Sequence, residues 1–220
     1  MINTKAFRNI SYGLYLISSC ADNAYSGCIV NTFLQVTSDP FQVSVVINKE
    51  NQTCETILEA EKYTATVLAK ETNMELIGTF GFHSSREIDK FKFCTVKTDE
   101  SGLPYVLEHA IARFSVSVTK TIDVGTHLLF VGAVTESEVL CENDPMTYAY
   151  YHQVKKGKTP PKASSYIPAD EAMVQRENVS PRKKAWRCSV CGHIEYSDIL
   201  PEDYTCPICG VGVEFFELVE

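Results

Sequence analysis

Long apolar runs are missing from this 220-residue sequence. A membrane-spanning helix needs about 18 to 20 consecutive apolar residues, and no window approaches that length. The N-terminal stretch MINTKAFRNI also lacks the apolar segment of a secretory signal. We therefore predict a soluble chain with no membrane partner, and the cytoplasm is the expected compartment.

Glycine and proline are also scarce, at 11 and 9 residues. This scarcity excludes collagen-like and low-complexity chains. Apolar residues make up 45% of the sequence and charged residues 22%, which is enough apolar sequence to bury a core. The net charge of −8 is opposite in sign to that of a typical nucleic-acid binder. We expect a globular protein with no nucleic-acid partner.

Two common phosphate-binding motifs are absent. No GxGxxG follows a strand-like run, and no GxxxxGK[ST] occurs. Neither a Rossmann dinucleotide site nor a P-loop is therefore supported. Without the acidic residue of a Rossmann site, the sequence does not distinguish NADH from NADPH as a donor.

Cysteine, by contrast, is abundant, with nine residues. An odd count in a chain without a secretory signal argues against a disulfide framework and favours metal or redox chemistry. Five of the nine are scattered over the first 141 residues. The other four lie close to the C-terminus: Cys188, Cys191, Cys206 and Cys209.

Charge divides the sequence into three parts. Residues 1–152 carry 11 basic and 18 acidic side chains, residues 153–185 carry 8 and 3, and residues 186–220 carry 1 and 7. The middle part is rich in Lys, Pro and Ser and has no sustained apolar period, which is typical of a linker.

These shifts in composition predict two domains, at 1–158 and 185–220, joined by a linker at 159–184. An alternative for the start of the basic segment stays open. Three of its lysines could bind an anionic ligand beside the first domain: Lys155, Lys156 and Lys158.

The first domain is predicted to consist mainly of β-strands. Runs rich in Val, Ile, Phe and Tyr, bounded by Asp-Asn, Ser-Gly and Asp-Pro turn signals, predict strands at 13–20, 26–38 and 41–48. The helical spacing of Ile57, Leu58 and Tyr63 predicts a helix over 53–63. Further strands are expected at 64–70, 106–120 and 126–140, with short helices at 4–9 and 74–81. The predicted fold class is mainly β, an antiparallel barrel with a few short helices.

Two segments of this barrel carry polar groups that suit a phosphate. They hold Asn48 and Lys49 in INKEN, and His83, Ser84, Ser85 and Arg86 in GFHSSREIDKF. Serine hydroxyls, backbone N–H groups at a helix start and a guanidinium together suit a phosphomonoester. HSSRE is equally an ordinary helix cap, with Ser84 or Ser85 as the N-cap residue. Composition alone leaves both readings open.

The order of three segments resembles the flavin reductase family of FMN-binding split barrels over residues 1–158. The segments are SGCIVNTFLQVTSDPFQVSVVINKEN, MELIGTFGFHSSREIDKF and TYAYYHQVKKGK. The resemblance implies bound FMN, a homodimer, and electron transfer from a reduced nicotinamide through the flavin. By position it also implies the residues that contact FMN. These are Asn31, Thr32 and Gln35 along the ring and ribityl chain, Ser44, Asn48 and Lys49 near the ribityl and phosphate, and His83, Ser84 and Arg86 at the phosphate end.

Two further residues of this domain have open roles. Cys28 is either a small buried strand residue, the commoner fate of a free cysteine, or a group beside the flavin. His152 lies in TYAYYHQ, where with Tyr148 and Tyr151 it could stack on or shield the flavin, or simply belong to the core or surface.

The C-terminal part contains two CxxCG motifs, with 14 residues between Cys191 and Cys206. Two such loops bring four thiolates together as a tetrahedral metal site. Gly192 and Gly210, after the second cysteine of each motif, permit a turn with positive φ that lets backbone N–H groups point at sulfur. Spacing alone leaves both zinc and iron open as the metal.

The whole C-terminal module resembles rubredoxins, with the short interval between motifs that is found in the form appended to rubrerythrins. The resemblance is carried by LPEDYTCPICG followed by VEFFELVE. It implies one iron (Fe2+/Fe3+) per chain in the four-cysteine site, with His193 as a surface residue outside the ligand set. A small aromatic core is expected from Trp186, Tyr196, Tyr204, Phe215 and Phe216.

Together the two halves resemble the high-molecular-weight rubredoxins. This implies an NAD(P)H-dependent oxidoreductase in which FMN reduces the iron, and the iron reduces a partner such as a flavodiiron protein that acts on oxygen or nitric oxide. The acidic C-terminal part would favour a basic patch on that acceptor. Two alternatives stay open: a ferric or flavin reductase with a structural zinc knuckle, and a non-enzymatic partner-binding module.

Overall fold

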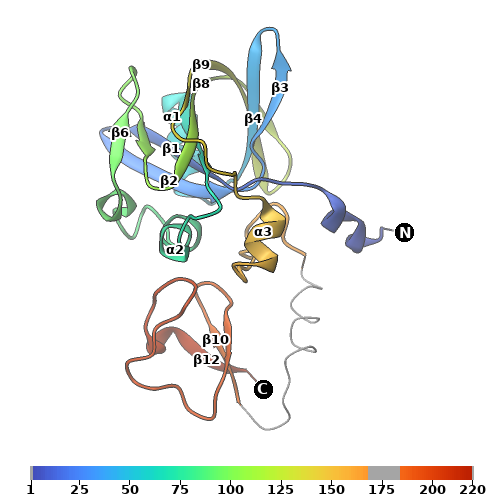
Figure 1. Ribbon diagram of the computed structural model, residues 1–220, viewed down its shortest axis with the longest axis vertical. Helices are drawn as coiled ribbons and strands as arrows, with labels where there is room; N and C mark the ends of the chain where they lie inside the picture. Colours follow the sequence, from blue (N-terminus) through green and yellow to red (C-terminus); the bar gives the residue numbers. More distant parts are fainter. Residues whose placement is uncertain (1, 168–183, 220) are drawn as a thin grey trace.

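The computed structural model describes residues 2–167 and 184–219. A large β domain lies above a small C-terminal unit, drawn in orange and red in Figure 1. Within the described ranges, no helix combines the length and apolar character needed to cross a membrane. Most of the predicted linker, residues 168–183, lies outside the described residues.

One seven-stranded antiparallel sheet forms the large domain, in the order β2-β1-β5-β8-β9-β4-β3. Its strands are β1 (Tyr15–Ala21), β2 (Ala24–Val30), β3 (Leu34–Ser38), β4 (Phe41–Asn48), β5 (Lys62–Leu68), β8 (Ala110–Asp123) and β9 (His127–Val139). The mainly β prediction is confirmed. The long β8 and β9 pair with β5 and β4, so the middle of the sheet is built from partners far apart in sequence.

Short helices and one small hairpin complete this domain. They are η1 (Thr4–Asn9), α1 (Gln52–Ala60), α2 (Met74–Phe82), η2 (Lys90–Phe93) and α3 (Tyr148–Gln153), with β6 (Val96–Thr98) paired to β7 (Pro104–Val106). Asn51, Asn73 and Thr147 cap the three α-helices, because each side chain accepts a hydrogen bond from a backbone N–H in the first turn. The side chain of Asn73 thereby fixes the start of α2.

Three predicted elements were wrong in extent. The strand predicted at 106–120 begins only at Ala110 and continues to Asp123, because Val106 belongs to β7 and a turn separates the two strands. The strand predicted at 26–38 is divided into β2 and β3, and Thr32 lies in the break. Its Oγ1 donates to the Val46 carbonyl at 2.9 Å and accepts from the Val46 N–H at 3.3 Å, which ties the end of β2 to β4. The helix predicted over 53–63 ends at Ala60, because Glu61 takes a left-handed conformation with φ 53° and Tyr63 belongs to β5.

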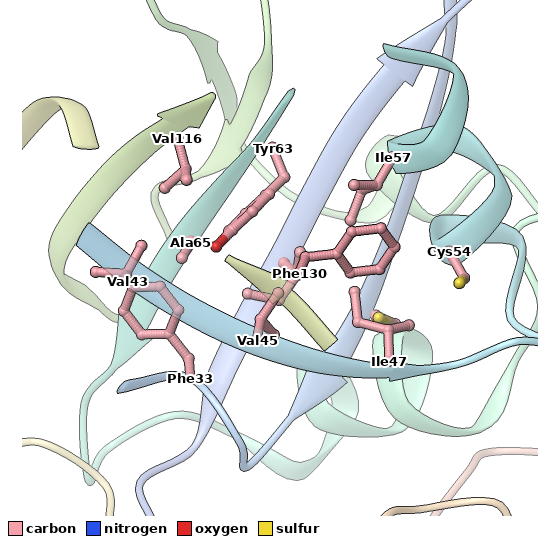
Figure 2. Close-up of a cluster of buried hydrophobic side chains, with 12 residues drawn as sticks. Phe33, Val43, Val45, Ile47, Cys54, Ile57, Tyr63, Ala65, Val116 and Phe130 are labelled. Atoms are coloured by element: carbon pink, nitrogen blue, oxygen red, sulfur yellow. The ribbon is translucent and has the colours of Figure 1, made fainter. Parts of the chain in front are cut away.

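The core of the barrel is packed with apolar side chains from several strands and α1 (Figure 2). Phe130 from β9, Val45 from β4 and Ile57 from α1 are fully buried there. Phe33, from the break between β2 and β3, packs into the same cluster. The departure from a continuous strand therefore also supplies a core side chain.

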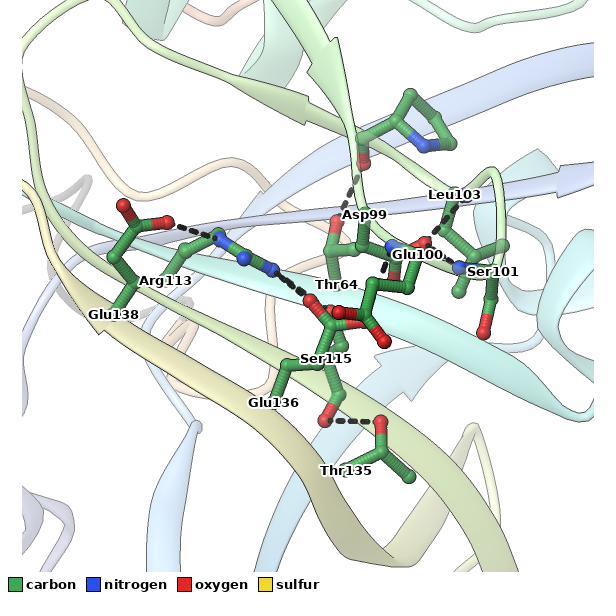
Figure 3. Close-up of polar contacts among 11 residues, drawn as sticks. Thr64, Asp99, Glu100, Ser101, Leu103, Arg113, Ser115, Thr135, Glu136 and Glu138 are labelled. Atoms are coloured by element: carbon green, nitrogen blue, oxygen red, sulfur yellow. Dashed lines mark hydrogen bonds and ion pairs between the residues drawn. The ribbon is translucent and has the colours of Figure 1, made fainter.

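Polar contacts attach the β6–β7 hairpin to the central strands β5 and β8 (Figure 3). Arg113 on β8 pairs with Glu136 at 2.8 Å and with Glu138 at 2.9 Å, and its guanidinium lies 4.7 Å from the centre of the Tyr105 ring on β7. Thr64 on β5 donates to the Pro104 carbonyl at 2.6 Å. These contacts make the hairpin part of the domain.

The C-terminal unit is a three-stranded sheet in the order β11-β10-β12, with β10 (Ala185–Cys188), β11 (Ile194–Tyr196), β12 (Phe216–Val219) and a short helix η3 (Val213–Phe215). Phe216 is buried and meets the Tyr204 ring edge-on at 5.3 Å. Trp186 Nε1 donates to the Ser197 carbonyl at 2.9 Å. Phe215 is 42% exposed, so its place in the predicted aromatic core was wrong: it ends η3 on the outer side.

Candidate functional site

The four C-terminal cysteines converge. Their Sγ atoms all lie within 4.8 Å of one another, and all four residues are buried. The sulfur of Cys188 is 3.7 Å from that of Cys209, and the sulfur of Cys191 is 3.5 Å from that of Cys206. A metal held at about 2.3 Å from each sulfur of a regular tetrahedron places the sulfurs about 3.8 Å apart. The donor set therefore fits one tetrahedral metal ion, as predicted.

The two ligand loops have the same backbone arrangement. Gly192 N–H donates to the Cys188 carbonyl and Gly210 N–H to the Cys206 carbonyl, both at 2.9 Å. The two glycines have φ of 76° and 75°, in the left-handed region that favours glycine. The predicted positive-φ turns are present, and each loop presents its pair of sulfurs to the same point.

Protons are shared unevenly among these thiols. The pKa of Cys206 is lowered because Cys191 and Cys209 hydrogen-bond to its sulfur, whereas the pKa of Cys191 is raised by its hydrogen bonds with Cys206 and Cys209. A metal cation binds thiolates and displaces the remaining protons. Metal binding at this cluster is therefore coupled to proton release.

His193 follows the first ligand loop and is not part of the convergent group. Its side chain is only 15% exposed, so its description as a surface residue was wrong. The ring meets Phe216 edge-on at 6.4 Å, and burial lowers its pKa. His193 is thus a largely buried residue that packs against Phe216.

A cavity of about 490 Å³ lies in the large domain beside α2 and α3. Cofactor pockets have volumes of about 300 to 1,000 Å³. Five of the nine predicted FMN-contacting residues line it: Asn31, Thr32, Asn48, His83 and Ser84. Ser189 and Val190, from the first ligand loop of the C-terminal unit, line the same cavity. The two candidate sites are thus adjacent.

The segment after α3 forms one wall of this cavity. Asn31 Nδ2 donates to Ser165 Oγ at 2.8 Å, and Asn48 Nδ2 donates to the Lys162 carbonyl at 3.0 Å. Lys158 also lines the cavity, whereas Lys155 Nζ is bound to the Thr72 carbonyl at 2.7 Å. Residues 159–167, predicted as the start of the linker, are therefore in contact with the candidate flavin site.

Four of the predicted residues do not line the cavity. Gln35 is exposed on β3, and Ser44 is buried in β4 between β3 and β9. Lys49 Nζ pairs with Asp123 at 2.7 Å, and Arg86 Nη2 pairs with Glu55 at 2.5 Å. Both cations thus have a carboxylate partner in this structure, and their contacts with FMN stay predictions.

The HSSRE segment forms a capped turn. Ser84 Oγ accepts from Arg86 N–H at 3.2 Å, and the Ser84 carbonyl accepts from Glu87 N–H at 3.1 Å. Ser85 Oγ accepts from Gly27 N–H at 3.3 Å and fastens the turn to β2. Ser84 therefore caps an isolated turn at 85–87 and no helix begins there, so the helix-cap interpretation was right about the cap and wrong about the helix. Ser84 also lines the cavity.

Cys28 and the aromatic group on α3 lie around the same space. Cys28 is 2% exposed and lines the cavity, and burial raises the pKa of its thiol. It is therefore both a buried strand residue and a neighbour of the candidate site. Tyr148 and Tyr151 line the cavity with rings stacked at 5.8 Å. His152 lies behind them, with Nδ1 at 2.8 Å from the Gly157 carbonyl and its ring edge-on to Tyr148.

Sequence reasoning missed the wall at 159–167 and the two C-terminal residues that line the cavity. Both lie in segments without helical or strand periodicity, so no local signal placed them there. The tyrosines of TYAYYHQ were a signal, since a run of aromatic residues beside a predicted flavin site suggests a lining role.

Known families match both parts of the chain. Residues 7–158 match the flavin reductase like domain, and residues 186–217 match the rubrerythrin, rubredoxin-like domain. A high molecular weight rubredoxin from Moorella thermoacetica is 39% identical over 234 aligned residues, which cover 99% of this chain and 100% of that protein. A ferric-chelate reductase (NAD(P)H) from Archaeoglobus fulgidus is 46% identical, with 76% of this chain and 98% of that protein covered. Among solved structures, the flavin reductase PheA2 shares the fold with a TM-score of 0.56 at 26% identity, covering 66% of this chain and 93% of the other.

Proposed function

The chain belongs to the flavin reductase-like family and carries a rubredoxin-like domain at its C-terminal end, and we propose that it passes electrons from NAD(P)H through FMN and one four-cysteine iron to a protein acceptor. It is an oxidoreductase with a flavin domain and a metal site of four thiolates. One observation carries the proposal: the first metal-binding loop, through Ser189 and Val190, lines the cavity that also holds the predicted flavin residues.

The cavity offers suitable groups for FMN. Asn31 and Asn48 line the cavity and would bind polar parts of the cofactor, and Ser84 and His83, which also line it, would bind the phosphate. Lys158 supplies a cation at the wall of the cavity. When bound, FMN supplies the ability to take a hydride and to release its two electrons one at a time. The family match and these polar groups together support FMN as the cofactor.

The metal site suits iron that changes charge by one unit. Four thiolates accept either iron or zinc, so the rubredoxin-like match decides in favour of iron. Backbone N–H groups near sulfur stabilise the more negative charge state. In the balanced reaction, NAD(P)H and two ferric ions give NAD(P)+, one proton and two ferrous ions.

The nicotinamide donor is supported by the Archaeoglobus relative, whose name includes NAD(P)H. The acceptor is proposed to be a redox protein such as a flavodiiron protein. A basic patch on that acceptor would bind the acidic C-terminal domain of this chain. The cytoplasmic location stays a prediction from the sequence.

A homodimer is also proposed. Leu34 and Val36 on the edge strand β3 and Phe41 on β4 are exposed by 55%, 50% and 64%. Exposed apolar side chains on a sheet edge favour pairing with another surface. Light scattering of the wild-type chain and of Phe41→Asp would test this surface, and a dimer that is unchanged in the variant would exclude it.

The electron-transfer function is tested by anaerobic spectroscopy. Adding NADH to the purified chain should bleach both the flavin bands and the ferric thiolate bands. If dithionite bleaches them but neither NADH nor NADPH does, the nicotinamide step is wrong. Metal analysis is the second measurement: one iron per chain is expected, and one zinc per chain would favour a partner-binding module.

A second candidate is favoured by the 46% identity of the barrel to a ferric-chelate reductase. In that case the barrel would reduce a ferric chelate directly, and the C-terminal metal would be structural. Ferric-chelate reduction by a zinc-loaded chain at the same rate as by the iron-loaded chain would support this function. Loss of reduction on replacing iron by zinc would exclude it.

A further inference from the structure

The second metal-binding loop lies directly against helix α2 of the barrel domain. Figure 1 shows α2 on the side of the barrel next to the C-terminal unit. The Ile208 carbonyl oxygen is so close to Gly78 that a Cβ added at this glycine would lie 2.6 Å from it. His83 Nε2 lies 3.0 Å from the Cys209 carbonyl oxygen. Phe82, between these two residues in the chain, packs against the cysteine cluster.

These contacts are specific in their chemistry. A carbonyl oxygen only accepts hydrogen bonds, so the bond to Cys209 places the His83 proton on Nε2. Gly78 is the position on α2 where the absence of a side chain lets the loop backbone approach. Gly81, one turn further on, is different: a Cβ there would lie 3.7 Å from Ile29, which is an ordinary contact.

His83 touches both candidate sites. It lines the flavin cavity, and its ring is bonded to the carbonyl of a metal-binding cysteine. Ser189 and Val190 of the other loop reach the same cavity. Both loops that carry the cysteines therefore face the barrel, so the metal approaches the flavin site by its ligand loops.

We propose that Gly78 and His83 form a docking seat on α2 that holds the ligand loops at the flavin cavity for electron transfer within one chain. The inference rests on the proposed function. The seat makes and breaks no covalent bond: one electron at a time passes from the flavin, reduced by NAD(P)H, to the ferric ion. Gly78 and His83 are positioning residues for this transfer.

The first test measures docking without electron transfer. In the FMN-bound, zinc-substituted chain, Gly78→Ala should increase hydrogen exchange of the loop amides around Cys209 and the radius of gyration from small-angle scattering. Alanine favours helix over glycine, so α2 itself is retained. Gly81→Ala is the matched control and should leave both quantities at wild-type values. Wild-type exchange and scattering in Gly78→Ala would overturn the seat.

The histidine is tested in the same zinc form. His83→Ala should increase exchange around Cys209, and His83→Gln should restore protection because its amide is again an N–H donor. Equal exchange in His83→Ala and wild type would remove His83 from the seat. These readouts do not depend on catalysis.

The kinetic test separates the seat from the proposed function. In stopped-flow mixing with NADH, the flavin of the iron-loaded Gly78→Ala chain should bleach at the wild-type rate. Its iron should bleach at least about tenfold more slowly, because a loss of about 1.4 kcal/mol of contact energy lowers the population of the docked state tenfold. Equal iron bleaching in variant and wild type would overturn the seat. Iron that NADH does not bleach in the wild-type chain would instead overturn the proposed function, while the exchange and scattering results would still decide the docking.

Discussion

Lys90 offers a sharp test of the electrostatics of the barrel. Its side chain is 2% exposed, at the start of η2. The ammonium donates to the Gly27 carbonyl at 2.8 Å and to the Phe80 carbonyl at 3.3 Å, and it lies 5.7 Å from the centre of the Phe80 ring. Burial lowers the pKa of Lys90 from 10.5 to about 8, and charge interactions with Cys28 and Glu87 oppose this shift only in part.

The pKa shift fixes the sign of a stability change with pH. Below pH 8 the lysine is charged in both the folded and the unfolded chain, so the cost of burying the charge is present in full. Between pH 8 and 10.5 the folded chain has released a proton that the unfolded chain still holds, and the free energy of unfolding therefore rises with pH. At 1.36 kcal/mol per pKa unit, the fall from 10.5 to about 8 corresponds to about 3 kcal/mol.

The assay compares wild type with Lys90→Met by urea unfolding at a series of pH values. Circular dichroism follows the barrel, since the single tryptophan, Trp186, lies in the C-terminal unit. The free energy of unfolding of wild type minus that of the variant should rise by about 3 kcal/mol from pH 7 to 10.5. Titrations of groups that do not interact with Lys90 are common to both chains and cancel in the difference.

Lys92→Met is the matched control, because it removes an exposed ammonium two residues away that pairs with Asp89 at 3.5 Å. The free energy of unfolding of wild type minus that of Lys92→Met should not rise between pH 7 and 10.5, in contrast to the difference for Lys90→Met. A difference between wild type and Lys90→Met that stays flat from pH 7 to 10.5 would refute the argument that burial of this ammonium is costly.

Three further predictions concern the core, the strand break and the metal. Phe130→Ala removes a fully buried ring and should lower the free energy of unfolding by about 3 to 5 kcal/mol in urea; a loss below about 1 kcal/mol would contradict the packing shown in Figure 2. Thr32→Val keeps the shape of the side chain but leaves the Val46 N–H and carbonyl without their partner, at a cost of about 1 to 3 kcal/mol in the same assay; no change would mean that the two bonds do not tie β2 to β4. Cys209→Ser should leave flavin reduction by NADH intact and abolish transfer to a protein acceptor, measured in anaerobic coupled assays; retained transfer would exclude the iron as carrier.

Most strands of the large sheet were predictable because their signals are local, whereas the β6–β7 hairpin was not predicted. β4 ends where the sequence predicted, at Asn48, and begins after the Asp-Pro turn signal. The break between β2 and β3 was not predictable, because Thr32 leaves the strand to bond Val46, 14 residues away. The end of α1 was missed for a different reason: Glu61 adopts a left-handed conformation, which is uncommon for glutamate and was not predicted from the sequence.

The metal site and the flavin cavity also differ in how far local sequence predicts them. The metal site follows from a doubled motif whose four ligands lie in two tight loops, so local spacing was sufficient. The flavin cavity combines segments from across the chain. Lys49 and Arg86 were predicted from their neighbours in sequence, but Asp123 on β8 and Glu55 on α1 reach them from elsewhere in the fold. No local pattern reports such partners.

The structure also removes a conflict between the capping and ligand-binding interpretations of the polar segments. Asn48 Oδ1 accepts from Glu50 N–H at 2.9 Å, and Ser84 Oγ accepts from Arg86 N–H at 3.2 Å. In both residues the local turn uses an acceptor. Asn48 Nδ2 also donates one hydrogen to the Lys162 carbonyl, so the donors that remain are its second amide hydrogen and the Ser84 hydroxyl hydrogen. Both residues line the cavity, and a phosphate needs donors. Capping therefore fixes the orientation in which these side chains can donate to an anionic ligand, so one short segment can serve both purposes.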